Sequence, residues 1–148
     1  MNCQDAKTPE KGGQNLKKSR IEPDKRLDQL ASVIVDAALE VHRYLGPGYL
    51  ESIYEEALAV ELTLRNLPFV RQISIPVRYK GQSVGQGRLD FLIDGALVVE
   101  LKAVDALHPV HKAQVISYLK ATGHQLGLLM NFNVPVLSQG IQRIVYSK

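Results

Sequence analysis

The stretch that decides the fold is RLDFLIDGALVVELK, residues 88–102. Large apolar side chains fill its odd positions on both sides of Gly95, and a period of two residues predicts a β-hairpin. A two-residue loop at 94–95 would place the apolar face of the first strand beside polar positions of the second. A three-residue loop at 93–95, with Gly95 in the left-handed conformation, restores one wholly apolar face. We therefore predict a loop of odd length.

The polar side chains of this hairpin are then Asp90, Glu100 and Lys102, which share the other face. Two carboxylates supply the hard oxygen ligands that a divalent cation such as Mg²⁺ (or Mn²⁺) prefers. The ammonium beside them could orient a water or stabilise negative charge on a phosphate. The spacing thus predicts a metal-dependent hydrolytic site. The alternative is a cross-strand salt bridge on a solvated sheet face.

The chain of 148 residues is 45% hydrophobic, which is enough for one domain with a core. It holds no run of about 18 apolar residues that would span a membrane, and no apolar N-terminal stretch typical of a secretory signal. Cys3 is the single cysteine, which excludes an internal disulfide and a cysteine-rich metal site. We expect a cytoplasmic protein that does not bind membranes.

The net charge of +3 resides in residues 1–26, which hold seven basic and four acidic side chains. Residues 27–148 then hold 11 of each sign. The first 26 residues are polar with few large apolar side chains, so we predict a disordered basic leader followed by one domain at 27–148. Such a leader is either a solvated tail or a phosphate-binding arm. The neutral domain argues against very tight nucleic-acid binding by its folded surface.

Patterning along the domain predicts helices at 27–45, 49–65 and 108–122, and strands at 69–79, 82–93, 96–103, 125–132 and 141–146. The helix between the third and fourth strands implies a right-handed crossover and a parallel strand pair. Pro76 within the first strand indicates an edge position or a bulge. The fold class is therefore α/β, with a mixed sheet flanked by helices.

Polar side chains on two of these helices are further candidates for the site. Glu51 stands near the start of the second helix, with Tyr54 one turn later. Glu51 is either a helix-start acid that suits the helix dipole or an additional metal ligand. Gln114 and Tyr118 lie four residues apart on the crossover helix. This pair either reaches the site or consists of a surface glutamine and a half-buried tyrosine.

Three motifs together resemble a known superfamily. Asp90 followed by ELK at 100–102 resembles the D…(D/E)xK core of the PD-(D/E)XK nuclease superfamily. QVISY at 114–118 resembles the QxxxY motif of its RecB-like branch. GYLESIY at 48–54 matches the signature of the GxxExxY protein family, which is assigned to the same superfamily. The resemblance covers residues 27–146, everything but the leader.

The resemblance implies an αβββαβ nuclease-like core, here with an extra N-terminal helix, and a hydrolase that cleaves nucleic-acid phosphodiester bonds with Mg²⁺ or Mn²⁺. It implies catalytic roles for Asp90, Glu100, Lys102 and Glu51, metal binding by Asp90, Glu100 and Glu51, and cleft positions for Gln114, Tyr118 and Tyr54. Leu89 stands where the motif has proline, a position that mainly shapes the strand. The alternative is a catalytically inactive domain of this fold that binds a protein partner or a small anionic ligand. Small relatives of this fold often dimerise, so a homodimer is a further expectation.

Overall fold

The computed structural model describes residues 24–147, so the leader predicted at 1–26 lies outside the described residues except for its last three. The helices are α2 (Lys25–Leu45), α3 (Glu51–Leu64) and α4 (Pro109–Thr122), with a 3₁₀ turn, η1, at Leu137–Gly140. The strands are β1 (Phe69–Tyr79), β2 (Gln82–Ile93), β3 (Leu97–Lys102), β4 (Leu126–Asn131) and β5 (Ile141–Val145). Every predicted element is present with ends within two residues of the prediction, whereas η1 is not predicted.

Helix α2 begins two residues before its predicted start because Asp24 caps it. The Asp24 carboxylate accepts a hydrogen bond from the Leu27 N–H at 2.8 Å, which satisfies one of the free donors of the first turn. The helix ends at Leu45, and the next residue, Gly46, adopts a φ of 70° and donates its N–H to the His42 carbonyl. Such a φ is readily adopted by glycine, so this residue lets the chain turn toward α3.

The strands form one mixed sheet in the order β1-β2-β3-β4-β5. Strands β1, β2 and β3 make an antiparallel meander, β4 runs parallel to β3, and β5 is antiparallel to β4. Helix α4 joins the parallel pair, as predicted for a crossover. Pro76 lies in the edge strand β1, where a residue without an N–H is tolerated. This arrangement confirms the predicted α/β class.

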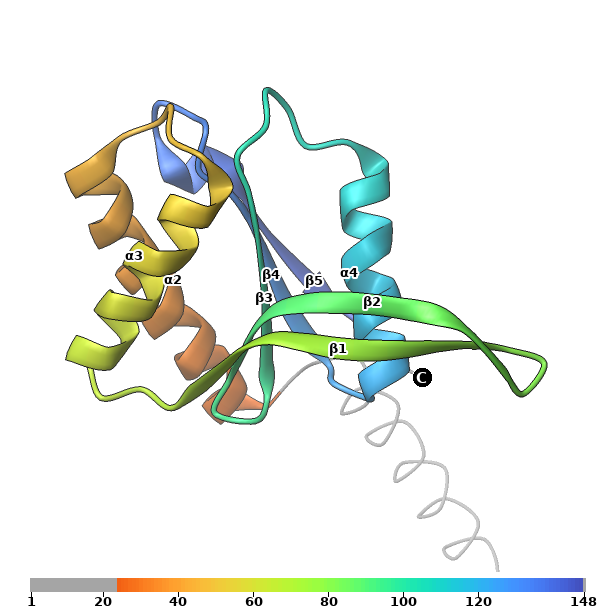
Figure 1. Ribbon diagram of the computed structural model, residues 1–148. Helices are drawn as coiled ribbons and strands as arrows, with labels where there is room; N and C mark the ends of the chain where they lie inside the picture. The colour runs from red at the N-terminus through yellow and green to blue at the C-terminus, as the bar shows by residue number, and fades with distance from the viewer. Residues whose placement is uncertain (1–23, 148) are drawn as a thin grey trace, which may run out of the picture.

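Helices cover both faces of the sheet: Figure 1 shows α2 and α3 on one side and α4 on the other. Each face has its own hydrophobic cluster. The sheet contributes to the cluster under α2 and α3 the side chains of Phe91, Ile93, Leu97, Val99, Leu101, Leu126, Leu128 and Met130. It contributes to the cluster under α4 those of Ile75, Leu89, Val98, Leu129 and Ile144. None of the helices within residues 24–147 is both long and apolar enough to cross a bilayer.

The loop between β2 and β3 has odd length, as predicted, but lies one residue farther along. Ile93 pairs with Leu97, so the loop comprises residues 94–96. Asp94 and Gly95 both have positive φ, 51° and 66°. Two successive left-handed residues make the type of tight turn whose twist matches that of the flanking strands. The apolar faces of β2 and β3 therefore coincide, and the polar residues face the other way.

Candidate active site

Strands β2 and β3 stop pairing at Asp90, and beyond this point carboxylate side chains accept the backbone hydrogen bonds. Their ladder has three residue pairs, the last being Phe91 with Val99. One step farther, the Asp90 N–H donates to Glu100 Oε1 at 2.8 Å, and the Leu101 N–H donates to Asp90 Oδ2 at 2.9 Å. Each carboxylate supplies an acceptor that a regular ladder would have provided. Both carboxyl groups are thereby fixed at one point between the two strands.

The edge strand is distorted at the same point. The β1–β2 ladder pairs the residues on both sides of Gln72 but skips Gln72 itself, which has a φ of 56°. A left-handed residue within a strand bends it and increases its twist. Leu89 consequently packs with the cluster under α4, whereas Phe91 packs under α2 and α3. The prediction that Leu89 shares the face of Phe91 is therefore wrong, and Asp90 between them is only 4% exposed.

Helix α4 brings a chain of hydrogen bonds to this point. Lys102 Nζ donates to Gln114 Oε1 at 3.3 Å, and Gln114 Nε2 donates to the Tyr118 hydroxyl at 3.1 Å. The same hydroxyl accepts a hydrogen bond from the Arg88 N–H at 3.3 Å. Gln114 and Tyr118 lie one turn apart on α4, so one face of the helix supplies both groups. These hydrogen bonds orient the Lys102 ammonium and connect α4 to β2.

Gly87 permits the close approach of α4 to β2. A Cβ atom at this position would lie 2.8 Å from Tyr118 Cε1, well inside the ordinary separation of two carbon atoms. The sequence carries a signal for it, because GQG at 85–87 interrupts a strand pattern, and glycine inside a strand often marks a close backbone approach. Gln86, Gly87 and Arg88 are site residues that motif spacing does not predict.

All of these groups line one cleft of about 370 Å³. Its lining residues are Glu51, Gln86, Gly87, Arg88, Asp90, Glu100, Lys102, Gln114 and Tyr118. Six of the seven residues predicted for the site are among them. Glu51 reaches the cleft from the first turn of α3, so the two helix layers and the central hairpin all contribute.

Tyr54, the seventh residue, lies in the core instead. Its side chain is fully buried, and its ring stacks on Phe132 with centroids 4.7 Å apart. Its hydroxyl donates to the Gly46 carbonyl at 2.6 Å and accepts from the Tyr49 N–H at 3.2 Å. Three helical residues rotate a side chain by about 300°, which turns Tyr54 from the cleft side occupied by Glu51 to the packed face of α3. Tyr54 therefore holds the α2–α3 loop rather than facing the cleft.

Burial raises the pKa of three carboxyl groups in the cleft, and for two of them the charge of Asp90 adds to the effect. Burial, followed by the nearby charge of Asp90, raises the pKa of Glu100 to about 8. Burial also raises the pKa of Asp90, although the Leu101 N–H and the charge of Lys102 oppose it. The pKa of Glu51 is raised by burial and then by the charge of Asp90. Without a cation the cleft therefore retains a proton near neutral pH, and a cation bound there would displace that proton because metal ligands must be deprotonated.

The donor set suits a cation that needs few protein ligands. Within residues 24–147, no group of three or more His, Cys, Asp or Glu side chains is arranged to hold a metal ion as it stands. Asp90 and Glu100 each use one oxygen for a backbone N–H and retain a second oxygen. Mg²⁺ is usually bound through one or two carboxylates and keeps several waters. The pair Asp90–Glu100 fits this mode, with Glu51 on the wall of the same cleft.

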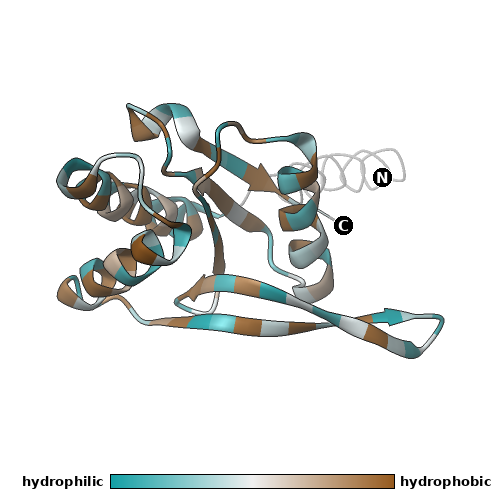
Figure 2. Ribbon diagram, turned by 45° about the horizontal axis from the view of Figure 1, so that its top comes forward, coloured by the Kyte–Doolittle hydropathy of each residue, from teal (hydrophilic) through white to brown (hydrophobic). Residues whose placement is uncertain are grey.

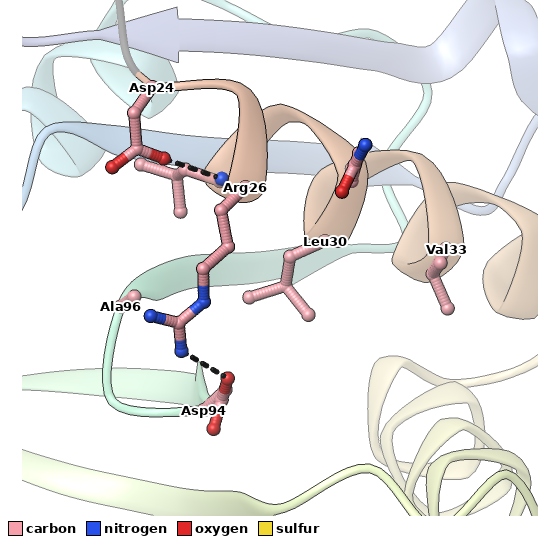
Figure 3. Close-up of a pocket in the computed structure, with 8 residues that line it drawn as sticks. Asp24, Arg26, Leu30, Val33, Asp94 and Ala96 are labelled. Atoms are coloured by element: carbon pink, nitrogen blue, oxygen red, sulfur yellow. Dashed lines mark hydrogen bonds and ion pairs between the residues drawn. The ribbon is translucent and has the colours of Figure 1, made fainter.

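Another cleft, of about 420 Å³, lies at the start of α2 and has a different character (Figure 3). Arg26 Nη2 lies 3.4 Å from Asp94 Oδ2, and Asp24 accepts the capping bond of α2. The Arg26 side chain is 84% exposed, and an exposed ion pair contributes little to stability. This cleft therefore reflects contacts between the start of α2 and the β2–β3 loop, and the cleft around Asp90 is the candidate active site.

Comparison with known proteins agrees with this geometry. A model of the PD-(D/E)XK nuclease superfamily matches residues 28–144. No curated protein matches the chain. The matched region contains every residue that lines the cleft around Asp90. Because the match covers well over half of the chain and the whole of this cleft, the chain belongs to the PD-(D/E)XK nuclease superfamily.

Proposed function

We propose that this protein is a Mg²⁺-dependent nuclease that hydrolyses phosphodiester bonds of nucleic acid. The observation that carries the proposal is the single cleft lined by Asp90, Glu100 and Lys102 together with Glu51 and Gln114. Membership of a nuclease superfamily supports the same type of reaction. Nucleases of this superfamily generally use divalent metals, which supports a cation at the two buried carboxylates.

The carboxylates are proposed to hold the cation. A divalent cation bound by Asp90 and Glu100, with Glu51 assisting, would offset the charge that develops on the phosphate and lower the pKa of a water. The hydrogen bonds from the Asp90 and Leu101 N–H groups hold the two carboxylates in place beforehand. Carboxylate ligands that are already oriented need little rearrangement as the reaction proceeds.

Lys102 is proposed to position the attacking water and stabilise the phosphate oxygens. Its ammonium has three N–H donors, one of which is directed at Gln114 Oε1. The others can reach a water or a phosphate oxygen in the cleft. The Tyr118 hydroxyl accepts two hydrogen bonds, from Gln114 and Arg88, so its own proton can be donated to substrate. Gln114 and Tyr118 would therefore bind substrate as well as orient Lys102.

A finer family assignment rests on two motifs. GYLESIY at 48–54 contains Glu51, which begins α3 and reaches the cleft. QVISY at 114–118 lies on α4 with its first and last residues on the cleft wall. Both support a place in the GxxExxY family and the RecB-like branch. We further propose nucleic acid as the partner and the cytoplasm as the compartment, with a homodimer as the first assembly to test.

A cleavage assay tests the proposal. Single- and double-stranded DNA and RNA are incubated with the protein in Mg²⁺, Mn²⁺ or EDTA. Asp90→Asn and Lys102→Ala should each lower cleavage by roughly 100-fold or more, the usual effect of losing a group that stabilises transition-state charge. Asp105→Asn, at an exposed loop position, is the matched control and should cleave normally. Cleavage that persists unchanged in both site variants would reveal a contaminating nuclease and overturn the assignment.

Binding without cleavage is a second candidate with one observation in its favour. Residues 27–148 hold equal numbers of basic and acidic side chains, whereas nucleic-acid-binding domains usually carry a basic excess. Under this alternative an inactive domain binds a protein partner or a small anionic ligand in the cleft. Absence of cleavage with every metal, together with no heat when Mg²⁺ is titrated in a calorimeter, would favour it.

A further inference from the structure

The far half of the β1–β2 hairpin extends away from the body of the protein (Figures 1 and 2). Every residue at 76–86, which we call the arm, is exposed. Tyr79 pairs with Gln82 across a two-residue turn, in which Lys80 and Gly81 have φ values of 49° and 82°. This tight turn keeps the strands paired to the tip. The arm thus presents two faces and a tip that no other described element covers.

The arm and its root carry an excess of positive charge. Residues 69–88 contain four basic side chains and no acidic one. Arg71 is neutralised by Glu55 and Glu56, whose carboxylates lie 3.2 and 2.6 Å from its Nη1. The other three basic residues are Arg78, Lys80 and Arg88. The ion pairs formed among residues 24–147 use Arg26, Arg43, Arg65, Arg71 and Arg143 instead. Arg78 and Lys80 therefore lie on the arm, and Arg88 lies at its root near the Glu51 and Asp90 carboxyls, in a domain whose overall net charge is zero.

Groups suited to bases accompany these cations. Tyr79 is 63% exposed, and Lys80 Nζ lies 5.4 Å from its ring centroid. Val84, on the neighbouring strand, is 61% exposed. A two-stranded β-ribbon fits the major groove of B-form DNA, where cations contact phosphates and aromatic or apolar groups contact base edges. Backbone pairing of the arm with an edge strand of another protein is less favourable. Pro76 lacks the N–H that such pairing needs, and charged side chains on an edge strand disfavour the approach of a second strand.

The arm is continuous with the cleft. Its last residue, Gln86, and the next two, Gly87 and Arg88, line the cleft itself. We propose that the arm lies along double-stranded nucleic acid whose backbone enters the cleft, an inference that rests on the proposed nuclease function. Arg88 lies seven residue steps from the tip at Gly81, a reach of about 23 Å. That reach spans about seven base pairs of a duplex.

Equilibrium binding measures the contribution of the arm without any cleavage. A fluorescent duplex of about 20 base pairs, and the matching single strand, are titrated with protein in EDTA at several salt concentrations. The double variant Arg78→Ala/Lys80→Ala should bind the duplex roughly tenfold more weakly, and its slope of log K against log salt should fall by about 2, one for each lost phosphate contact. Arg78→Lys/Lys80→Arg keeps the charge and should bind normally.

Two exposed basic residues of α2 supply the matched control. Lys25→Ala/Arg43→Ala removes the same formal charge from α2, away from the arm (Figure 1), and should bind like the wild type. If the arm variant matches that control while the wild-type protein binds the duplex, the arm is not the contact surface and the proposed nuclease function stands. If the arm matters equally for the single strand, the assignment of a duplex is overturned.

Two further outcomes bear on the proposed nuclease function and on the oligomeric state of the protein. If neither the wild-type protein nor the variant binds any nucleic acid, the nuclease function and the inference fail together. If light scattering shows a dimer that Arg78→Ala/Lys80→Ala converts to a monomer, the arm is an interface between copies of this chain, and the inference is overturned.

Discussion

The buried carboxyl of Glu100 should destabilise the protein without metal at neutral and alkaline pH. Glu100 is 3% exposed, and burial together with Asp90 raises its pKa from 4.5 to about 8 in the folded state. Between these two values the folded protein holds a proton that the unfolded chain releases. The resulting stability is therefore complete below pH 4.5 and is lost as the pH rises to about 8.

The magnitude follows from the two pKa values. Relative to the protonated protein, the linkage lowers the free energy of unfolding by about 1 kcal/mol at pH 5 and by about 4 kcal/mol at pH 8. Glu100→Gln removes the ionisation but keeps an oxygen that can accept the hydrogen bond from the Asp90 N–H. In EDTA this variant should therefore exceed the wild type in stability by about 4 kcal/mol at pH 8 and by about 1 kcal/mol at pH 5.

Urea unfolding followed by circular dichroism across this pH range measures the difference. Glu56→Gln is the matched control, because that glutamate side chain is 70% exposed and should show no comparable gain. Mg²⁺ at pH 8 should stabilise the wild type and have much less effect on Glu100→Gln, since a ligand that binds the folded state stabilises it. If the wild type and Glu100→Gln lose stability in parallel between pH 5 and pH 8, the reasoning about these buried carboxyls is refuted.

Substitutions at three further positions distinguish residues that orient groups in the cleft from residues that pack the fold. Gln114→Ala should lower kcat roughly tenfold, because it removes the acceptor that orients the Lys102 ammonium. Gln114→Glu restores an acceptor and should recover part of the loss. An unchanged kcat for Gln114→Ala would count against a positioning role for Gln114. Gly87→Ala should lower the free energy of unfolding by about 1–3 kcal/mol in denaturant melts, because its Cβ meets the Tyr118 ring. Adding Tyr118→Leu should restore stability but not cleavage, and no recovery would show that the clash lies elsewhere. Tyr54→Phe should cost about 1–2 kcal/mol through its lost hydroxyl bonds while kcat stays the same; a large fall in kcat would return Tyr54 to the cleft.

The central hairpin shows how far alternation along the chain can predict structure. Parity alone requires an odd-length loop, and the structure confirms it. The exact position of the loop depends on whether Asp94 adopts a positive φ, which hydrophobic patterning does not encode. The placement of Leu89 failed for a related reason. Its face is set by the bend at Gln72 and Asp90, where carboxylates replace the ladder.

Motif spacing predicted most of the cleft because each motif is local, lying on one helix or on the two strands of one hairpin. Gln114 and Tyr118 share a helix face whatever that helix packs against. The same reasoning misplaced Tyr54, because spacing along α3 does not reveal which side of the helix meets the sheet. Gly87 and Arg88 were missed because their part in the cleft comes from the approach of α4 to β2, a contact between segments distant in sequence.

By itself the sequence determined the α/β class, the order of the elements and the set of candidate residues, since periodicity and motif order are local properties of the chain. Only the tertiary structure decided that Glu51, Asp90 and Gln114, from separate elements, line one cleft. It also decided that the carboxyl groups there have raised pKa values. The physical reason is that burial and the distance between charges depend on how α3 and α4 pack on the sheet, which no local pattern specifies.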